Sequence, residues 1–221
     1  MPLQRTEPAG RSLVPPLRTS GDRYAPVKRI IDVVGAACLI PFCAPVLLIG
    51  AAAVWLDAGA PVIHRRRVLG RRGDPFDAYK LRTMVRDADH ILAEDEELRS
   101  RYAAANKLAT DPRVTRSGRW LRRLSLDEVP QLVNVLKGEM SLVGPRMLTA
   151  NELADWGDEA DAVMSVRPGI TGLWQVSGRQ TVGKSERIRL DAEYVRGMSL
   201  GLDLAILART VPAVLSGRGA C

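Results

Sequence analysis

The sequence predicts a mainly helical α+β fold, with an N-terminal membrane-embedded helix followed by a compact domain that contains a short β-hairpin. Three observations carry this prediction: a long uncharged apolar run near the N-terminus, short apolar pieces on either side of a glycine-rich turn, and later segments with apolar residues at helical spacing. A hydrophobic content of 46% in 221 residues is enough for one domain whose core needs no disulfides.

Composition divides the chain into four parts. Residues 1–26 are rich in Pro, Arg, Gly and Ser and lack apolar periodicity, which predicts a disordered tail. Residues 27–60 hold the membrane-embedded helix, residues 61–216 form the compact domain, and residues 217–221 are a C-terminal tail.

The apolar run lies between Asp32 and Asp57, and as a continuous helix it would be about 36 Å long, enough to cross a bilayer. Pro41 and Pro45 fall near its middle, where each removes a backbone hydrogen bond and bends the helix. Basic residues flank both ends, and the positive-inside rule places both flanks in the cytoplasm. A re-entrant helix, broken at a proline, satisfies both observations; a spanning helix with a proline kink is the alternative.

The net charge of +7 and a pI near 9.8 indicate an anionic partner: nucleic acid, an anionic membrane surface or a phosphorylated substrate. An aromatic content of 5% is low for a protein that stacks bases, which disfavours nucleic acid. Cys38, Cys43 and Cys221 lack zinc-ligand or redox spacing, and the two histidines are isolated. We therefore predict neither a transition-metal cluster nor a catalytic triad.

A predicted helix follows two adjacent carboxylates, Asp127 and Glu128. Its apolar positions recur at i, i+3, i+4 and i+7, and a Lys-Gly pair supplies its stop. These apolar positions are Val129, Leu132, Val133 and Leu136. The start is open between two arrangements: Ser125 and Glu128 have capping-box spacing, whereas Pro130 fits the first turn better if Asp127 is the N-cap.

Either start places both acids at a helix N-terminus, where unpaired N–H groups and the helix dipole favour anions. We therefore expect Asp127 to be ionised near neutral pH and available as a nucleophile or metal ligand. The alternative is simple capping, the commoner use of acids at helix starts.

The remaining segments have simpler interpretations. Residues 62–82 predict a strand hairpin around GRRGDP, and residues 86–105 a solvated helix. A helix over 151–163 leads to RPGITGLWQVSGR, whose turns and terminal arginine could cradle phosphate. Two helices end the chain: one contains Asp191, and the other, over 200–215, is apolar enough to lie at a membrane interface or in the core.

Four motifs occur in order between Lys28 and Leu215: KRIIDVVG, KLRTM, LRRLSLDEVPQLVNVLKGEMSLVGPR and RPGITGLWQVSGR. Together they resemble the bacterial sugar transferase family, the monotopic polyprenyl-phosphate phosphoglycosyl transferases, in its small single-domain form. The resemblance implies an enzyme that passes a sugar-1-phosphate from a nucleotide diphosphate sugar, by resemblance a UDP-sugar, to undecaprenyl phosphate. This step would start exopolysaccharide or glycoconjugate assembly.

The resemblance also implies catalytic roles. Asp127 would attack the sugar-linked phosphorus and form a covalent aspartyl-phosphosugar, while Glu128, with Asp127, would hold Mg²⁺ and Lys80 would lie near the nucleophile. A covalent intermediate lets two bulky phosphate substrates use one site in turn. Mg²⁺ and arginines would neutralise charge on the transferring group.

By motif position, phosphate binding is assigned to Arg122, Arg146, Arg82 and Arg179, and a supporting role to Asp191. For Lys80, Arg82 and Asp191 the alternative is an ion pair that positions the Asp127 helix.

Two departures from the family pattern concern rigidity. The family's helix break is often preceded by serine, whereas here Ala44 precedes Pro45, and Pro41 is a second candidate for the break. Met147 stands where the family commonly continues GPR with proline, so this turn is expected to be less rigid.

The implied location is the bacterial inner membrane, with the catalytic domain on the cytoplasmic face and interfacial amphipathic helices. The implied partners are the nucleotide sugar, the polyprenyl phosphate, the membrane and downstream glycosyltransferases, but no nucleic acid, and a homo-oligomer is compatible with them. The alternative function is an inert membrane-anchored scaffold that binds anionic partners through its basic face.

Overall fold

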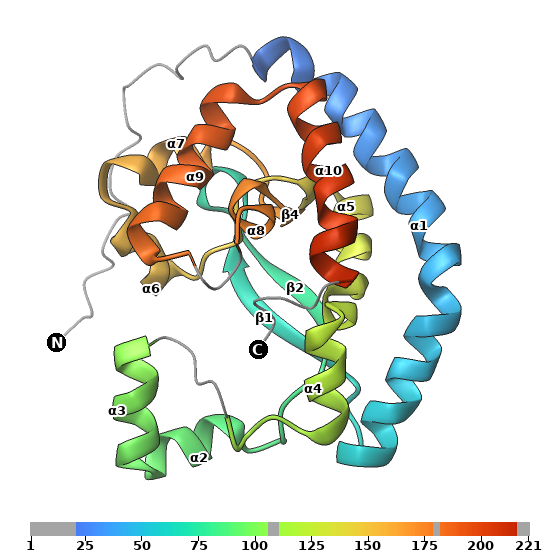
Figure 1. Cartoon of the computed structure of the whole chain (residues 1–221), viewed down its shortest axis with the longest axis vertical. Coiled ribbons are helices and arrows are strands. Elements are labelled where there is room, and N and C mark those ends of the chain that lie inside the picture. Colours follow the sequence, from blue (N-terminus) through green and yellow to red (C-terminus); the bar gives the residue numbers. More distant parts are fainter. Residues whose placement is uncertain (1–20, 106–110, 179–181, 216–221) are drawn as a thin grey trace, which may run out of the picture.

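The computed structural model describes residues 21–105, 111–178 and 182–215, and this part of the chain is mainly helical, as predicted. A long helix, α1 (Gly21–Ala58), arches along one side of the molecule, and the hairpin of β1 (Ile63–Leu69) and β2 (Pro75–Leu81) lies at the centre (Figure 1). The shorter helices surround the hairpin, except that α2 and α3 form a separate arm at one end (Figure 1).

The other elements are short. They are η1 (Arg71–Gly73), α2 (Ala88–Glu94), α3 (Glu96–Ala105), α4 (Arg116–Arg123), η2 (Leu126–Gln131), α5 (Leu132–Lys137), β3 (Ser141–Val143), α6 (Ala150–Leu153), η3 (Ala154–Glu159), α7 (Ala160–Met164), β4 (Gly169–Thr171), α8 (Leu173–Val176), α9 (Lys184–Gly197) and α10 (Leu200–Leu215). The helices predicted over 86–105 and 151–163 are therefore each divided, the first at Asp95 and the second around Gly157, whose φ is +49°.

Helix α1 corrects two expectations. It begins at Gly21, inside the stretch predicted to be a disordered tail, and it runs for 38 residues through Pro26, Pro41 and Pro45 without interruption. Each proline removes one backbone hydrogen bond and bends a helix, but the remaining bonds of the neighbouring turns are kept. The predicted break at Pro41 or Pro45 is thus replaced by the curve seen in Figure 1.

Most of the apolar surface of α1 faces outward. Within the described residues it is the one helix long and apolar enough to cross a membrane, and 11% of its most apolar window is buried. Phe42, Leu48 and Leu56 are 81%, 71% and 77% exposed. Monomeric soluble proteins rarely expose an apolar face of this extent, which indicates contact with a membrane or a partner.

Polar contacts hold the N-terminal part of α1 on the folded body. The buried carboxylate of Asp203 in α10 accepts hydrogen bonds from Tyr24 (2.8 Å), from Lys28 and from Tyr194 of α9 (2.8 Å). Five residues after Tyr24, Arg29 donates to two carbonyls at the end of α5, at 2.6 and 3.0 Å. One carboxylate therefore joins α1, α9 and α10.

The C-terminal end of α1 is held in a similar way. The Asp57 carboxylate accepts the backbone N–H of Ser117 at 2.7 Å, at the start of α4. Arg82 donates to the carbonyl oxygens of Ala58 and Gly59, each at 2.5 Å. Both ends of α1 are thus attached to one and the same folded body.

The hairpin is confirmed. Strands β1 and β2 are antiparallel, and their register pairs His64 with Lys80 and Arg66 with Ala78. Because side chains two residues apart on a strand share a face, these two pairs lie on the same face of the hairpin, about 7 Å apart along the strand.

The helical segment that holds the acids begins after Ser125, the N-cap of the first predicted arrangement, but without its capping box. Ser125 has φ +55° and makes no side-chain capping bond, and Asp127 and Glu128 lie inside the first turn of the 3₁₀ helix η2. The stop is confirmed: α5 ends at Lys137, and Gly138 follows in the left-handed conformation with φ +84°.

The predicted apolar stripe is correct for only part of this helix. Leu132 is 5% exposed and Val135 is fully buried, whereas Val133 and Leu136 are 44% and 38% exposed. A 3₁₀ helix has about three residues per turn, so the segment before Leu132 shifts the buried face away from the one expected for a continuous α-helix.

A parallel pair of short strands, β3 and β4, lies beside this helix, and it includes the extended piece predicted after Pro168. The two chains approach very closely there. A Cβ on Gly169 would lie 2.1 Å from the backbone nitrogen of Gly144, so only glycine is accommodated.

We predict that Asp203→Ala lowers the free energy of unfolding by about 3–5 kcal/mol, because it leaves the buried Lys28 ammonium without its carboxylate. Thermal and denaturant unfolding in detergent micelles would measure the loss. Asp155→Ala is the matched control, because Asp155 pairs with Lys184 at the surface and its removal should cost less than about 1 kcal/mol. Equal losses in the two variants would contradict the role given to Asp203.

Candidate active site

The two adjacent acids meet basic side chains from two other elements. Lys80, at the end of β2, donates to Glu128 Oε1 at 2.5 Å, and both side chains are largely buried. Arg122, at the end of α4, donates through Nε to the hydroxyl of Thr83 at 2.8 Å, and its charge acts on Asp127. The structure thus brings together four of the predicted site residues.

Asp127 is 9% exposed, and its electrostatics differ from the expectation for a helix cap. Burial and the neighbouring Glu128 raise the pKa of the Asp127 carboxyl to about 6, while the charges of Lys80 and Arg122 oppose this rise. At pH 7 the carboxylate is still about 90% ionised. Its ionisation depends on two cationic side chains more than on the helix terminus.

Arg146 and Asp191 lie in a second group, together with a residue that the sequence did not single out. Asp191 is fully buried and accepts the backbone N–H of Arg146 at 3.4 Å. Arg187 Nε lies 4.0 Å from Asp191 Oδ2, one helical turn before it on α9. That i, i+4 spacing was the sequence signal that could have identified Arg187. Burial raises the pKa of Asp191 to about 7, with Arg187 opposing the rise.

The hairpin connects the two groups. Lys80 contacts Glu128, and Arg66, on the same hairpin face, donates to Glu152 at 3.2 Å. Glu152 and Arg66 both act electrostatically on Arg187, which places them at the second group. The acid pair and the arginine pair therefore lie against one face of the hairpin.

Two predicted phosphate ligands do not join these groups. Arg82 Nη2 donates to the carbonyls of Ala58 and Gly59, so Arg82 is attached to the end of α1 and forms no ion pair with the Asp127 helix within the described residues; its role toward phosphate stays a prediction. Arg82 is 6% exposed, which leaves little access for a ligand. Arg179 lies outside the described residues.

The acid pair fits a magnesium ion better than a transition metal. No group of three or more His, Cys, Asp or Glu side chains suited to a metal exists within the described ranges, so this part of the chain offers no all-protein cage. Mg²⁺ is usually held by one or two carboxylates together with waters and substrate phosphates. Asp127 and Glu128 are the adjacent carboxylates that could fill this role, and burial together with Glu128 raises the pKa of Asp127.

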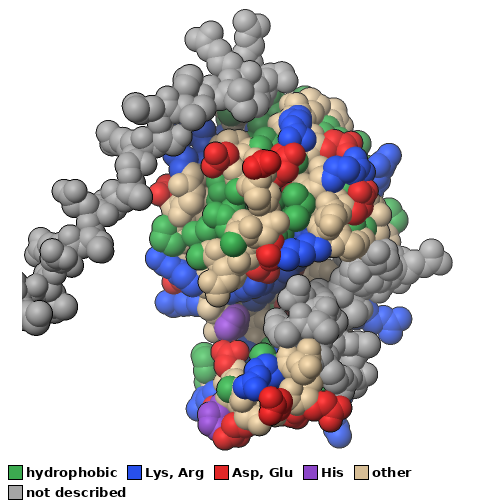
Figure 2. All heavy atoms as spheres, turned by 90° about the vertical axis from the view of Figure 1, so that its left-hand side faces the viewer, with side chains coloured by type: hydrophobic (Ala, Val, Ile, Leu, Met, Phe, Trp, Pro, Cys, Tyr) green, Lys and Arg blue, Asp and Glu red, His purple; other side chains and the backbone are tan. Residues whose placement is uncertain are grey.

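Surface features agree with a basic, phosphate-directed face. Lys and Arg side chains gather in a band across the middle of one side of the molecule, above the arm formed by α2 and α3 (Figure 2).

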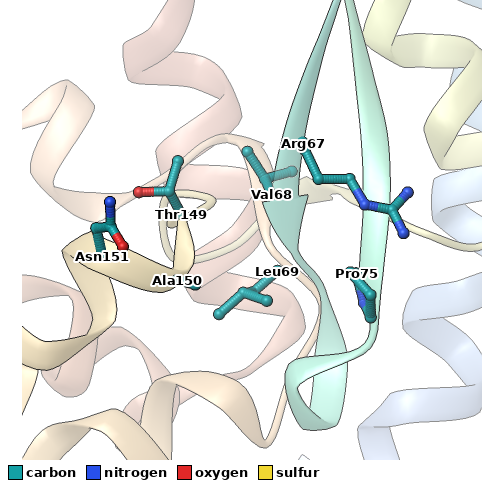
Figure 3. Close-up of a pocket in the computed structure, with 7 residues that line it drawn as sticks. All are labelled: Arg67, Val68, Leu69, Pro75, Thr149, Ala150 and Asn151. Atoms are coloured by element: carbon teal, nitrogen blue, oxygen red, sulfur yellow. The ribbon is translucent and has the colours of Figure 1, made fainter.

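A pocket between the far end of the hairpin and α6 contains none of the predicted site residues (Figure 3). It is lined by Arg67, Val68, Leu69, Pro75, Thr149, Ala150 and Asn151.

Comparison with known proteins supplies the family. Residues 23–217 match the model of a family described as "Bacterial sugar transferase". The chain belongs to this family. The match covers nearly all of the described residues, including both groups of site residues.

Several relatives of this transferase family are similar over most of the chain. The exopolysaccharide production protein ExoY of Rhizobium meliloti is 41% identical over 87% of this chain and 87% of its own length. The undecaprenyl-phosphate galactose phosphotransferase of Salmonella typhimurium is 41% identical over 88% of this chain. The UDP-glucose:undecaprenyl-phosphate glucose-1-phosphate transferase of Caulobacter vibrioides is 42% identical over 86% of this chain and 70% of its own length.

The relatives differ in size. This chain spans 42% of a sugar transferase of Haemophilus influenzae and 41% of the Salmonella protein, but most of ExoY. Their names connect the family with sugar transfer to undecaprenyl phosphate and with exopolysaccharide production.

We predict that Asp127→Asn stabilises the protein at pH 7.5 when no ligand is bound. The pKa of Asp127 is about 6 in the folded protein and about 4 in the unfolded chain, so the folded state binds this proton more tightly. The charged Asp127 carboxylate therefore lowers the free energy of unfolding. This loss is absent below pH 4 and complete above pH 6, where it amounts to about 2–3 kcal/mol. Denaturant titrations of both proteins should show that the substitution raises the free energy of unfolding by less at pH 4.5 than at pH 7.5.

The exposed Asp158→Asn serves as the control for this experiment, because Asp158 lies at the surface of η3 and should leave stability unchanged at both pH values. If the Asp127→Asn protein is less stable than the wild type at pH 7.5, ionisation of Asp127 is not unfavourable in the folded protein, and the interpretation above is wrong.

Proposed function

We propose that this chain transfers a sugar-1-phosphate from a UDP-sugar to undecaprenyl phosphate through a covalent intermediate on Asp127. The observation that carries the proposal is the buried group of Asp127, Glu128, Lys80 and Arg122, which combines a carboxylate nucleophile with cations for phosphate. Membership of the family and the names of its relatives support the substrate classes.

In the first step, an Asp127 carboxylate oxygen attacks the sugar-linked phosphorus of the UDP-sugar. The bond from this phosphorus to the bridging oxygen breaks, UMP leaves with the electron pair, and the sugar phosphate remains on the carboxylate. A carboxylate is a weak nucleophile, so the reaction depends on positioning and on neutralising the phosphate charge. Lys80 and Arg122 are the described basic groups whose charges act on Asp127.

In the second step, a phosphate oxygen of undecaprenyl phosphate attacks the same phosphorus. The bond to Asp127 breaks, the carboxylate is restored, and the product is an undecaprenyl diphosphate sugar. Because UMP has left before the lipid reacts, one group of cations can serve both substrates in turn.

Asp127 and Glu128 are the residues that would hold Mg²⁺, which supplies charge neutralisation for the transferring phosphate when bound. Lys80 donates to Glu128 at 2.5 Å, so Glu128 would share or exchange this partner if it held the ion. The charge of this lysine also offsets part of the repulsion between the two adjacent acids.

We also propose that α1 enters and leaves one leaflet of the cytoplasmic membrane, with the rest of the chain on the cytoplasmic face. The outward apolar face of α1 supports burial in lipid. Its two ends are attached to the same body, through Asp203 at one end and Ser117 at the other, and a helix that crossed the bilayer would have to break one of these attachments.

A labelling experiment tests the nucleophile. With UDP-glucose or UDP-galactose carrying ³²P at the sugar-linked phosphate, and with Mg²⁺ present, the wild-type chain should acquire protein-bound label and release UMP. Asp127→Asn should acquire no label, and its UMP release should fall by about three orders of magnitude or more. Label that persists on Asp127→Asn would disprove the assignment.

The same experiment includes a metal arm and a control. EDTA should abolish both label and UMP release, and added Mg²⁺ should restore them, whereas Glu128→Gln should need more Mg²⁺ than the wild type. Asp158→Asn, on the surface of η3, should be labelled like the wild type. Release of no UMP from any UDP-sugar would instead favour an inert membrane-anchored scaffold.

Cysteine labelling in intact cells tests the topology. Ala25→Cys and Ala60→Cys introduce single thiols at exposed positions near the two ends of α1, after the native cysteines are replaced. A membrane-impermeant maleimide should modify neither position until the cells are permeabilised. Modification of one position in intact cells would show that α1 spans the membrane.

A further inference from the structure

Arg187 has a setting unlike that of any other arginine in the described part of the chain. Its guanidinium lies 4.8 Å from the ring centre of Trp156 and 5.0 Å from that of Trp174. Arg146 lies 5.5 Å from the same Trp174 ring centre, so two cationic groups lie near one aromatic ring. Both tryptophans are buried, at 4% and 6% exposure.

The charges of this group do not balance. Asp191 is the nearest acid, yet Arg187 Nε lies 4.0 Å from its Oδ2, too far for a hydrogen bond, and Arg146 reaches Asp191 only through its backbone N–H. Glu152, the other acid nearby, accepts from Arg66 and Thr149. Two guanidinium groups therefore share a single buried carboxylate.

Hydrogen-bond donors are in excess as well. Among the described residues, five buried N–H groups around this point have no acceptor: Arg146 Nε, Arg187 Nε, Arg187 Nη2, Trp156 Nε1 and Trp174 Nε1. The facing acceptor, Asp191 Oδ2, is also without a partner. Unpartnered buried donors are costly, particularly on a charged group, so an arrangement of this kind is typical of a site that awaits an anion.

The chemistry of the donors favours a phosphate group. A guanidinium presents planar, forked N–H groups that match two phosphate oxygens, and stacking on an aromatic ring fixes the plane of the fork before the ligand arrives. A phosphate also offers several acceptor oxygens, enough for donors from more than one side chain. A chloride or a single carboxylate would leave several of these donors unpaired.

We propose that Arg187 forms a phosphate clamp with Arg146, held open by Trp156 and Trp174, with Asp191 as the resident counter-ion of the empty clamp. This inference rests on the proposed function and on the assignment of Arg146 to phosphate by the family resemblance, and it adds Arg187 as a substrate-binding residue. The hairpin face that carries Arg66 beside this clamp also carries Lys80 beside the acid pair, so the clamp holds its phosphate next to the nucleophile.

Binding measurements on the full chain in detergent test the clamp without turnover. The probes are UDP and a short-chain polyprenyl monophosphate, each titrated by calorimetry into the wild type, Arg187→Gln and Arg187→Lys. We expect Arg187→Gln to weaken binding of at least one probe by about 10- to 100-fold, the cost of losing charge-assisted hydrogen bonds. The probe that is affected identifies which substrate's phosphate occupies the clamp.

Arg189→Gln is the matched control, because Arg189 lies two residues further along α9 and pairs at the surface with Glu186 and Glu193. Its affinities should stay within about twofold of the wild type. Affinities of Arg187→Gln within twofold of the wild type for both probes would overturn the proposal. If Arg187→Gln does not fold, Arg187→Lys decides: it keeps the charge but not the fork, so unchanged affinities for both probes would likewise overturn it.

Thermal unfolding without ligand distinguishes a phosphate-binding clamp from an arginine–tryptophan stack whose role is purely structural. A clamp predicts that Arg187→Gln unfolds at or above the wild-type temperature, because the change removes unpartnered donors and repulsion from Arg146. A structural stack predicts a lower unfolding temperature with unchanged affinities, which would overturn the proposal. The covalent-label experiment is independent: failure of labelling on Asp127 would refute the proposed function and leave these affinities as they are.

Discussion

The carboxylate of Asp203 is the contact on which the arrangement of the molecule depends. It accepts hydrogen bonds from Tyr24 and Lys28 of α1 and from Tyr194 of α9, so a single buried charge joins three helices. Helix α1 turns most of its apolar side chains outward, but a narrow inner face, with Ala36 and Val54 fully buried, packs on the body. Polar attachments at its ends, and at Asp32, which accepts from Ser141 and Leu142, add direction to this packing. A buried ion pair is weak evidence of stability but good evidence of a specified arrangement, since displacement of α1 would leave Lys28 and Asp203 uncompensated.

Fixing α1 at both ends has a consequence for the site. Strand β2 connects the end of α1 to the acid pair. Arg82, directly after β2, donates to a carbonyl at the end of α1, and Lys80, within β2, pairs with Glu128. If α1 lies in the membrane, the acid pair is held at a fixed depth relative to the lipid surface. A transferase that must bring a soluble nucleotide sugar and a lipid phosphate to one carboxylate requires such a fixed depth, because a misplacement of about 1 Å can cost a large factor in rate.

Local signals predicted much of the fold, and contacts between distant segments explain most of the errors. The hairpin and the stop at Gly138 follow from turn chemistry and were predicted, as was the grouping of Asp127, Glu128, Lys80 and Arg122, which came from the family motifs. The apolar stripe was partly wrong because a 3₁₀ segment precedes α5. The contacts of Arg82 were not predicted because its partners are carbonyls at the end of α1, and Arg187 was missed because its tryptophans come from two other segments. Neither contact leaves a pattern in the sequence around the arginine.

The two groups on the hairpin face share one physical property: in each, burial and a like-charged neighbour oppose the ionised form of a side chain. Burial, and next the adjacent Glu128, raise the pKa of Asp127 to about 6, while burial, and next the adjacent Arg146, lower the pKa of Arg187 to about 10. The two groups lie against one face of the hairpin, with the acids on η2 and Arg187 on α9. A metal ion at the acids and a phosphate at the arginines would stabilise both ionised forms. Ligand binding would then offset the unfavourable free energy of these two groups in the folded protein. Unfavourable arrangements of this kind persist at functional sites for that reason.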